Sequence, residues 1–141
     1  MKAKHVLAGS IISAAIGLGG YGMVGAEEAA PPQFAGNKVT PLIDRAFSGD
    51  GQWRVIANLY EVPAGAMVPR HFHHGDEFHL VLSGEWEAEV EGRAPHLMKA
   101  GDSQYVEREL WHGGKVVGDA PLKLLGVMIV EKDKPIIELA R

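Results

Sequence analysis

Histidines gather in one stretch of the sequence, and their spacing points to metal chemistry. Four of them fall between positions 70 and 80, and a single residue separates His71 from His73. Residues two apart on a strand point to the same side, so both imidazoles can reach one metal ion. Glu77 can add a carboxylate, and His112 can supply a fourth donor from another strand of a closed barrel. Two histidines and one carboxylate leave coordination positions open for oxygen or substrate.

The remaining composition narrows this chemistry. The chain of 141 residues has no cysteine, which excludes a disulfide framework, a thiolate nucleophile, an iron–sulfur cluster and a cysteine-ligated zinc site. Acidic residues outnumber basic ones by 18 to 14, which argues against binding to nucleic acid through phosphate contacts. No glycine-rich phosphate loop and no Gly-x-Ser-x-Gly elbow is visible. A metal bound here must therefore be held by nitrogen and oxygen.

The residues around the histidines resemble the first motif of the cupins. That motif runs Gly, five residues, His, one residue, His, three or four residues, Glu, six residues, Gly. The chain fits it at every spacing, with Gly65, His71, His73, Glu77 and Gly84. Five matches at fixed spacing make a chance agreement rare. The sequence thus resembles a small single-domain cupin of the conserved-barrel, RmlC-like type.

The second cupin motif is kept only in part. The family pattern is Gly, five residues, Pro, one residue, Gly, two residues, His. Here Gly101 and His112 match, whereas Glu107 replaces the proline and Glu109 replaces the glycine. Val116 stands where the family often has asparagine. These departures affect the expected shape of the turn more than the assignment of His112 as a ligand.

The resemblance implies both a fold and a metal site. The fold is an all-β barrel of six to eight strands, a double-stranded β-helix or jelly roll, over residues 38–141. The site is one divalent metal ion held by His71, His73, Glu77 and His112, with Glu77 as ligand or as general base. Imidazole and carboxylate ligands suit iron, manganese, nickel, copper or zinc, so the donors alone do not choose among these metals.

Three further residues near the motifs have open roles. His74 alternates with His73 and is expected to point away from the metal. His79 shares the parity of Glu77, so it is a proton shuttle or a donor to a ligand, or else a core histidine with satisfied hydrogen bonds. Trp111 either borders the pocket or packs against the barrel.

The rest of the chain has the pattern of short strands between Gly, Pro and Asp residues. Within residues 85–91 apolar and acidic residues alternate, so Trp86, Ala88 and Val90 should face the core and the glutamates should face water. A short helical turn is predicted at residues 41–47 and a short helical piece at residues 135–140. The predicted strands cover residues 53–62, 77–82, 85–91, 103–106 and 124–130.

Residues 1–26 have the layout of a signal peptide. A basic start with Lys2 and Lys4 is followed by an uncharged stretch that ends at Gly25 and Ala26. This predicts cleavage after Ala26, a flexible leader over residues 27–37, and a mature protein in the periplasm or outside the cell. The alternative is an uncleaved membrane anchor, which the many glycines of the stretch disfavour.

The expected function is that of a metal-dependent enzyme, an oxygenase of a small oxygenated or phenolic molecule in the quercetin-dioxygenase-like group. The alternatives are non-redox chemistry, as in an isomerase, lyase or decarboxylase, and a cupin that binds zinc or a small ligand without turnover. A structural barrel with an empty site is disfavoured, because buried imidazoles and a buried carboxylate are costly without a metal. The expected partner is a small-molecule substrate, with no nucleic acid and no membrane span after cleavage. Cupins often pair through sheet edges, so the resemblance also implies a homodimer.

Overall fold

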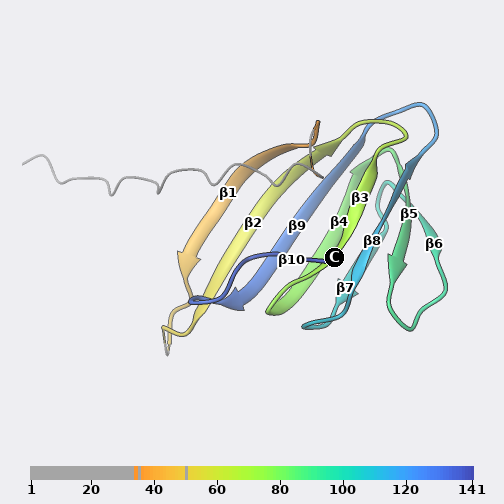
Figure 1. Ribbon diagram of the computed structural model, residues 1–141. Helices are drawn as coiled ribbons and strands as arrows, with labels where there is room; N and C mark the ends of the chain where they lie inside the picture. Colours follow the sequence, from red (N-terminus) through yellow and green to blue (C-terminus); the bar gives the residue numbers. More distant parts are fainter. Residues whose placement is uncertain (1–33, 35, 50) are drawn as a thin grey trace, which may run out of the picture.

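The described part of the chain forms two β-sheets that face each other (Figure 1). The computed structural model describes residues 34, 36–49 and 51–141. The elements in this part of the chain are all strands, which confirms the all-β expectation. Their bounds are β1 Lys38–Ala46, β2 Trp53–Val62, β3 Met67–Phe72, β4 Gly75–Ser83, β5 Glu85–Val90, β6 His96–Lys99, β7 Ser103–Val106, β8 His112–Val117, β9 Leu122–Glu131 and β10 Glu138–Leu139.

Strands that are distant in sequence lie side by side within each sheet. The first sheet has the order β1-β2-β9-β4-β7 and the second has the order β10-β3-β8-β5-β6. Strand β2 pairs with β9 along its whole length, from Trp53 opposite Glu131 to Val62 opposite Leu122. From β2 to β10 the chain passes repeatedly from one sheet to the other, which is the connectivity expected of a double-stranded β-helix.

Alternation along the strands fills the space between the sheets with apolar side chains. On β5, Trp86, Ala88 and Val90 are buried whereas Glu87 and Glu89 are exposed, which confirms the pattern predicted for this run. Two buried apolar clusters result, one formed by Val62, Val81, Trp86, Ala88, Met98, Val116, Leu122 and Leu124 and one formed by Ile56, Met128 and Val130.

The helical turn predicted at residues 41–47 is wrong, because most of this segment belongs to β1. That strand is an edge of the first sheet and pairs with β2, with a bulge between Pro41 and Ile43. Proline cannot donate an N–H to the ladder, so sheets accept it mainly at edges and bulges. Most of β1 is exposed on both faces, so the segment lacks the alternation that identified the other strands.

The helical piece predicted at residues 135–140 is also wrong. Two residues there form β10, in which Glu138 and Leu139 pair with Phe72 and His71 of β3. This segment is extended because it pairs with β3, which is far away in sequence. The local pattern of residues does not reveal such a partner. The end of the chain therefore lies along the strand that carries His71.

Most of the N-terminal predictions lie outside the described residues. These are the signal peptide of residues 1–26 and residues 27–33 and 35 of the leader. Phe34, from the expected leader, is half-buried, and its ring centroid lies 5.8 Å from that of His71. Within residues 34, 36–49 and 51–141, no helix has the length and apolar character needed to cross a membrane.

Candidate metal centre

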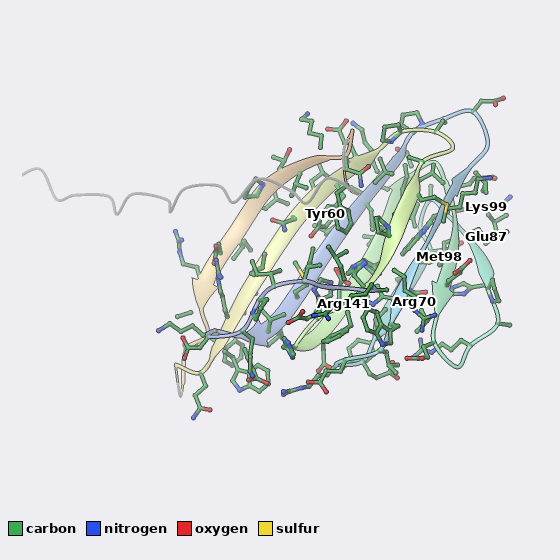
Figure 2. All side chains as sticks on the ribbon, in the orientation of Figure 1. Tyr60, Arg70, Glu87, Met98, Lys99 and Arg141 are labelled. Carbon is green, nitrogen blue, oxygen red and sulfur yellow. The ribbon has the colours of Figure 1, made fainter. Side chains whose placement is uncertain are left out.

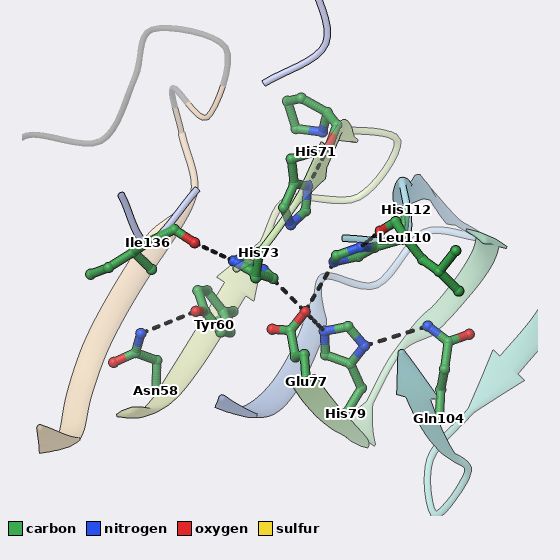
Figure 3. A network of polar contacts seen from close by, with 11 residues as sticks. Asn58, Tyr60, His71, His73, Glu77, His79, Gln104, Leu110, His112 and Ile136 are labelled. Carbon is green, nitrogen blue, oxygen red and sulfur yellow. Dashed lines mark hydrogen bonds and ion pairs between the residues drawn. The ribbon is translucent and has the colours of Figure 1, made fainter. Parts of the chain in front are cut away.

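Four donor side chains meet in the space between the two sheets (Figure 3). His71 lies on β3, His112 on β8 and Glu77 on β4, while His73 lies in the connection between β3 and β4. One donor atom from each residue lies within 4.8 Å of the others. All four residues are buried, with exposed fractions between 2% and 6%. The structure therefore brings together the four residues that the sequence analysis selected.

Strand register and the crossing of the chain produce this convergence. His71 pairs with His112 across β3 and β8, and the centroids of their rings lie 4.2 Å apart. The chain then leaves the second sheet at His73, whose ring centroid lies 5.0 Å from that of His71. Strand β4 belongs to the first sheet, so it presents Glu77 from the opposite side of the interior.

Hydrogen bonds to the backbone fix how the three imidazoles face one another. Nδ1 of His71 and Nδ1 of His112 each lie close to the carbonyl oxygen two residues earlier in the chain, at 2.6 and 2.9 Å. Nδ1 of His73 contacts the carbonyl oxygen of Ile136. A carbonyl oxygen only accepts, so each Nδ1 carries a proton and donates it. Each neutral ring is then left with a lone pair on Nε2, which is the tautomer of a metal ligand.

The Nε2 atoms fit a bound cation. Oε2 of Glu77 lies 3.0 Å from Nε2 of His112 and 3.2 Å from Nε2 of His73. Among the described residues, the buried Nε2 of His73 has no hydrogen-bond partner of good geometry. A nitrogen lone pair that faces a carboxylate oxygen at such a distance is unfavourable unless a positive charge is present. The residues are therefore compatible with one divalent metal ion of the class that prefers nitrogen and oxygen.

Without such a cation, the histidines must supply the positive charge themselves. Burial and the nearby His112 and His73 lower the pKa of His71 to about 3, so this ring stays neutral at neutral pH. Burial also lowers the pKa of His73, but the carboxylate of Glu77 outweighs it and the pKa rises overall. Burial raises the pKa of Glu77, yet His79, His73 and the hydrogen bond from His112 hold it well below the usual range. A metal ion would take over this charge balance.

His79 also contacts the cluster, but its proton is on the other ring nitrogen from that of the three candidate ligands. The amide nitrogen of Gln104 lies 3.4 Å from Nδ1 of His79 and donates to it. Nε2 of His79 therefore carries the proton, and it lies 3.1 Å from Oε2 of Glu77 in an ion-pair contact. The ring is 4% exposed and packs edge-on against Trp86, with the centroids 5.3 Å apart. Of the roles left open by the sequence, this geometry matches a donor to a ligand.

The sequence analysis missed a tyrosine and a glycine on the other side of Glu77. The hydroxyl of Tyr60 accepts a hydrogen bond of 3.0 Å from the amide of Asn58. Burial and the charge of Glu77 raise the pKa of Tyr60, so its phenol stays protonated. A Cβ at Gly126 would lie 2.7 Å from the ring of Tyr60 and 3.3 Å from Oε1 of Glu77. A glycine inside an apolar strand was the available signal, because it often marks a close approach.

The other motif residues lie around the cluster. His74 points away from it, as predicted, and lies 3.3 Å from the carboxylates of Glu109 and Glu138. Glu109 has a φ of 62°, so it takes the left-handed conformation at the position where the cupin motif has glycine. Glu109 therefore has the backbone conformation that a glycine adopts readily. Trp111 packs edge-on against Phe72, with the ring centroids 4.8 Å apart, which matches the packing alternative.

Comparisons with solved structures agree with this fold. The DMSP lyase DddQ from Ruegeria pomeroyi aligns with a TM-score of 0.60 and 24% identity over 74% of this chain and 51% of its own, so this chain spans about half its length. An uncharacterized conserved protein with a double-stranded beta-helix domain from Klebsiella pneumoniae aligns with a TM-score of 0.59 and 20% identity, over 79% of this chain and 90% of its own. KdgF from Halomonas sp. aligns with a TM-score of 0.56 and 19% identity, over 70% of this chain and 83% of its own. At these identities the likeness shows the fold alone.

Comparison with protein families gives the affiliation. A search of the curated proteins found no match. The pattern of the cupin domain family matches residues 58–129, which is half of the chain and includes β3, β4 and β8 with their candidate donors. The double-stranded β-helix expected from the two motifs is confirmed by the sheets. The chain belongs to the cupin family.

Proposed function

We propose that the protein is an exported, metal-dependent cupin enzyme that moves a proton on a small oxygenated molecule. The observation that carries the proposal is the orientation of three buried imidazoles, each of which donates from Nδ1 to a backbone carbonyl and presents Nε2 to the cluster. Burying three polar rings in this orientation has an unfavourable desolvation free energy, and a purely structural barrel does not need such rings. This orientation is the arrangement by which metal ligands are held in other proteins.

The metal would be held by His71, His73, Glu77 and His112, and it would polarise a carbonyl or carboxylate oxygen of the substrate. Iron, manganese, nickel, copper and zinc all accept this donor set. The burial of the four residues limits the site to a small molecule or to one end of a larger molecule.

The residues around Glu77 keep its carboxylate ionised, which is the form that can accept a proton. Its two carboxylate oxygens have different surroundings, because Oε2 faces the imidazoles while Oε1 faces Gly126 beside Tyr60. Oε1 is thus placed to accept a proton from a carbon next to the polarised carbonyl. Nε2 of His79 lies 3.1 Å from Oε2, and this contact orients the carboxylate. Glu77 is therefore the proposed catalytic base as well as a candidate ligand.

This arrangement favours non-redox chemistry, as in a lyase, an isomerase or a decarboxylase, over the oxygenase expected from the sequence. An oxygenase needs only the ligands and an open coordination position. Proton transfer also needs a carboxylate oxygen outside the ligand contacts, and Oε1 of Glu77 meets this need because Oε2 makes the contacts with the imidazoles. Two of the solved structures similar in fold are DMSP lyases by their titles, which supports the same choice. Oxygenase chemistry is the second candidate, because the donor set also suits iron.

Metal analysis tests the site. Wild-type protein, purified without chelator and loaded with each candidate metal in turn, should hold close to one ion per chain. His71→Ala and His112→Ala should lose it, because each removes one donor of the cluster. His96→Ala is the matched control, because this histidine lies exposed on β6 outside the cluster. A folded wild type that holds none of the metals would overturn the proposal.

Two assays on the loaded protein separate the reaction classes. In deuterated water, NMR should show deuterium entering substrates that carry an acidic C–H next to a carbonyl, and Glu77→Gln should abolish this exchange. An oxygen electrode should show no uptake with the same compounds or with enols, catechols and flavonols. Oxygen uptake without exchange would replace this proposal by the oxygenase. Ligand-dependent thermal stabilisation without either reaction would identify a binding protein instead.

The proposed location is the periplasm or the cell exterior, and it depends on the signal-peptide layout of residues 1–26. N-terminal sequencing of protein recovered from the host should begin at Glu27. Recovery of a membrane-bound chain that starts at Met1 would favour an uncleaved anchor. The proposed partners are a small-molecule substrate and a second copy of the chain.

A further inference from the structure

The three imidazoles of the cluster are not oriented by the same parts of the chain. For His71 and His112, the carbonyl that accepts the proton of Nδ1 lies only two residues earlier in the sequence. Each of these rings is therefore held by its own stretch of chain. For His73 the accepting carbonyl is that of Ile136, 63 residues later. Of the three candidate nitrogen ligands, His73 is the one whose orientation depends on a distant segment.

His73 is also the candidate donor that lies outside a strand. It belongs to the connection between β3 and β4, whereas the other three donors lie within strands. Two hydrogen bonds of 3.0 Å fix the backbone of this connection, from the amide of Glu109 to the carbonyl of His73 and from the amide of Glu131 to the carbonyl of His74. They do not fix the side-chain torsions of His73, which decide where its ring points. The contact with Ile136 therefore has the task of orienting the ring.

Ile136 belongs to the C-terminal segment, residues 132–141, which follows β9. Its side chain packs against the smaller of the two buried apolar clusters. Further along, β10 pairs with β3, and the amide of Ala140 donates to the carbonyl of Arg70 at 3.1 Å. In Figure 2 the labelled Arg141, the last residue, accordingly lies beside the labelled Arg70. The segment is thus docked along the strand that leads to His73.

This docking is weaker than the pairing of the long strands. Strand β10 has two residues and is the edge of the second sheet, and residues 132–135 are exposed. The side chain of Glu138 adds a contact of 3.3 Å with His74. Terminal segments with few buried contacts open at a lower free energy than core strands do. The C-terminal segment can therefore detach while the rest of the barrel stays folded.

We propose that the backbone carbonyl of Ile136 positions His73 for the metal, so that the metal site is complete only while the C-terminal segment is docked. In the docked state Nδ1 of His73 donates to this carbonyl, and Nε2 faces Oε2 of Glu77 (Figure 3). In the detached state Nδ1 bonds to water and the ring is free to adopt other rotamers. The proposal rests on the metal site of the proposed function, but it does not depend on the class of reaction.

Coupling between docking and metal binding acts in both directions. If docking strengthens metal binding by a certain factor, a bound metal strengthens docking by the same factor. The amide of Ala140 reports on docking, because its hydrogen bond to Arg70 is broken when the segment detaches. Metal binding should therefore slow the hydrogen exchange of this amide at least tenfold.

Zinc affinity of the full chain, processed as its host processes it, gives the first test. Zinc suits the donor set and is diamagnetic, and competition with a chelator measures its dissociation constant. Ile136→Ala removes the apolar anchor of the segment and should weaken zinc binding about 10- to 100-fold. Ile137→Ala is the matched control, because Ile137 is also half-buried but belongs to neither apolar cluster of the described residues. This variant should bind zinc like the wild type.

NMR of the same proteins separates positioning from a general loss of stability. In Ile136→Ala, the proton on Nδ1 of His73 should exchange with water at least tenfold faster than in the wild type. The Nδ1 protons of His71 and His112 should keep their rates, because their acceptors are local. A chain that ends at Pro135 lacks the carbonyl itself and should show the same changes. If circular dichroism shows that this shorter chain does not fold, Ile136→Ala decides the test.

Unchanged zinc affinity in Ile136→Ala would overturn the proposal. So would equal acceleration of all three ring protons, an equal loss of affinity in Ile137→Ala, or exchange at Ala140 that zinc does not slow. A wild type that holds no metal would contradict the proposed function separately. The metal-free protein then decides the positioning role, and a His73 ring proton that exchanges no faster in Ile136→Ala than in the wild type would exclude it.

Discussion

At the scale of single residues, the contact between His79 and Glu77 allows a positioning role of His79 to be distinguished from simple packing. His79→Leu removes the donor and should weaken metal affinity by about 10- to 100-fold, as is usual when the partner of a ligand is lost. His79→Gln keeps a donor nitrogen near the same place and should recover most of the affinity. Competition with a chromogenic chelator measures both constants. Equal losses in the two variants would mean that His79 acts only through packing against Trp86.

Gly126 shows how closely the backbone approaches the site. A methyl group at this position would lie 2.7 Å from the ring of Tyr60, which is closer than carbon atoms approach without movement. Gly126→Ala should therefore displace Tyr60 or Glu77 and lower both metal affinity and thermal stability, with a cost of about 1–3 kcal/mol for overpacking. Lys123→Ala on the same strand is the control. Urea unfolding and metal titration of the two variants check this, and an unaffected Gly126→Ala would show that the ring is free to move.

At the scale of elements, the turn between β7 and β8 carries a local conflict. Glu109 is held at a φ of 62°, where a residue with a side chain loses about 1 kcal/mol relative to glycine. Glu109→Gly should therefore keep or raise stability by up to about 1 kcal/mol, although it removes an exposed contact with His74. Glu107→Gly, which removes a contact with Arg93 at ordinary φ, should lower stability by about 0.5–1 kcal/mol. Thermal unfolding compares the stability of the two variants. If Glu109→Gly loses as much stability as Glu107→Gly, the backbone at Glu109 is not strained.

The edge strand β1 gives a prediction for pH dependence. Arg54 of β2 donates to both carboxylate oxygens of Asp44, at 2.6 and 2.5 Å, and this hydrogen bonding lowers the pKa of Asp44 from its ordinary value of 3.8. As the pH falls, Asp44 takes up a proton in the unfolded chain before it does so in the folded chain. The contribution of the Asp44–Arg54 pair to the free energy of unfolding is therefore complete above about pH 4 and is lost below it. The pair is partly exposed, so screening limits it to about 0.5 kcal/mol. Urea unfolding from pH 3 to 6 should show a shallower acid loss in Asp44→Asn than in the wild type or in Asp133→Asn, and equal slopes would exclude the pair as a contributor.

The same elements show what a sequence alone reveals. The strands with one buried face, such as β2, β5 and β9, were predicted because alternation follows from burial. The predicted strand ranges did not include β1, β3, β6, β8 or β10. The edge strand β1 and the two-residue β10 were missed because their extended form depends on partners far away in sequence. Four candidate donors were found because a metal site requires fixed spacing. Tyr60 and Gly126 were missed because contact between β2, β9 and Glu77 is created only by sheet order.

At the scale of the whole molecule, the site joins the two sheets. His71 and His112 come from the second sheet and Glu77 comes from the first, so a metal ion bound by all of them links both halves of the barrel. The unfolded chain offers no such preformed site, so binding free energy becomes folding free energy. The metal is therefore expected to stabilise the entire fold and not only its ligands.

This coupling has a measurable size. At a free metal concentration about 100-fold above the dissociation constant, binding adds about 2.7 kcal/mol to the free energy of unfolding, which corresponds to roughly 10 °C in Tm for a domain of this length. Chelation should lower the Tm by that amount, and addition of the metal should restore it. His96→Ala should respond like the wild type, whereas His112→Ala should have the same Tm with and without the metal, because one donor from the second sheet is gone. A wild-type Tm that ignores both chelator and metal would show that the buried cluster balances its charges internally, through the ion pair of His73 with Glu77, and holds no metal.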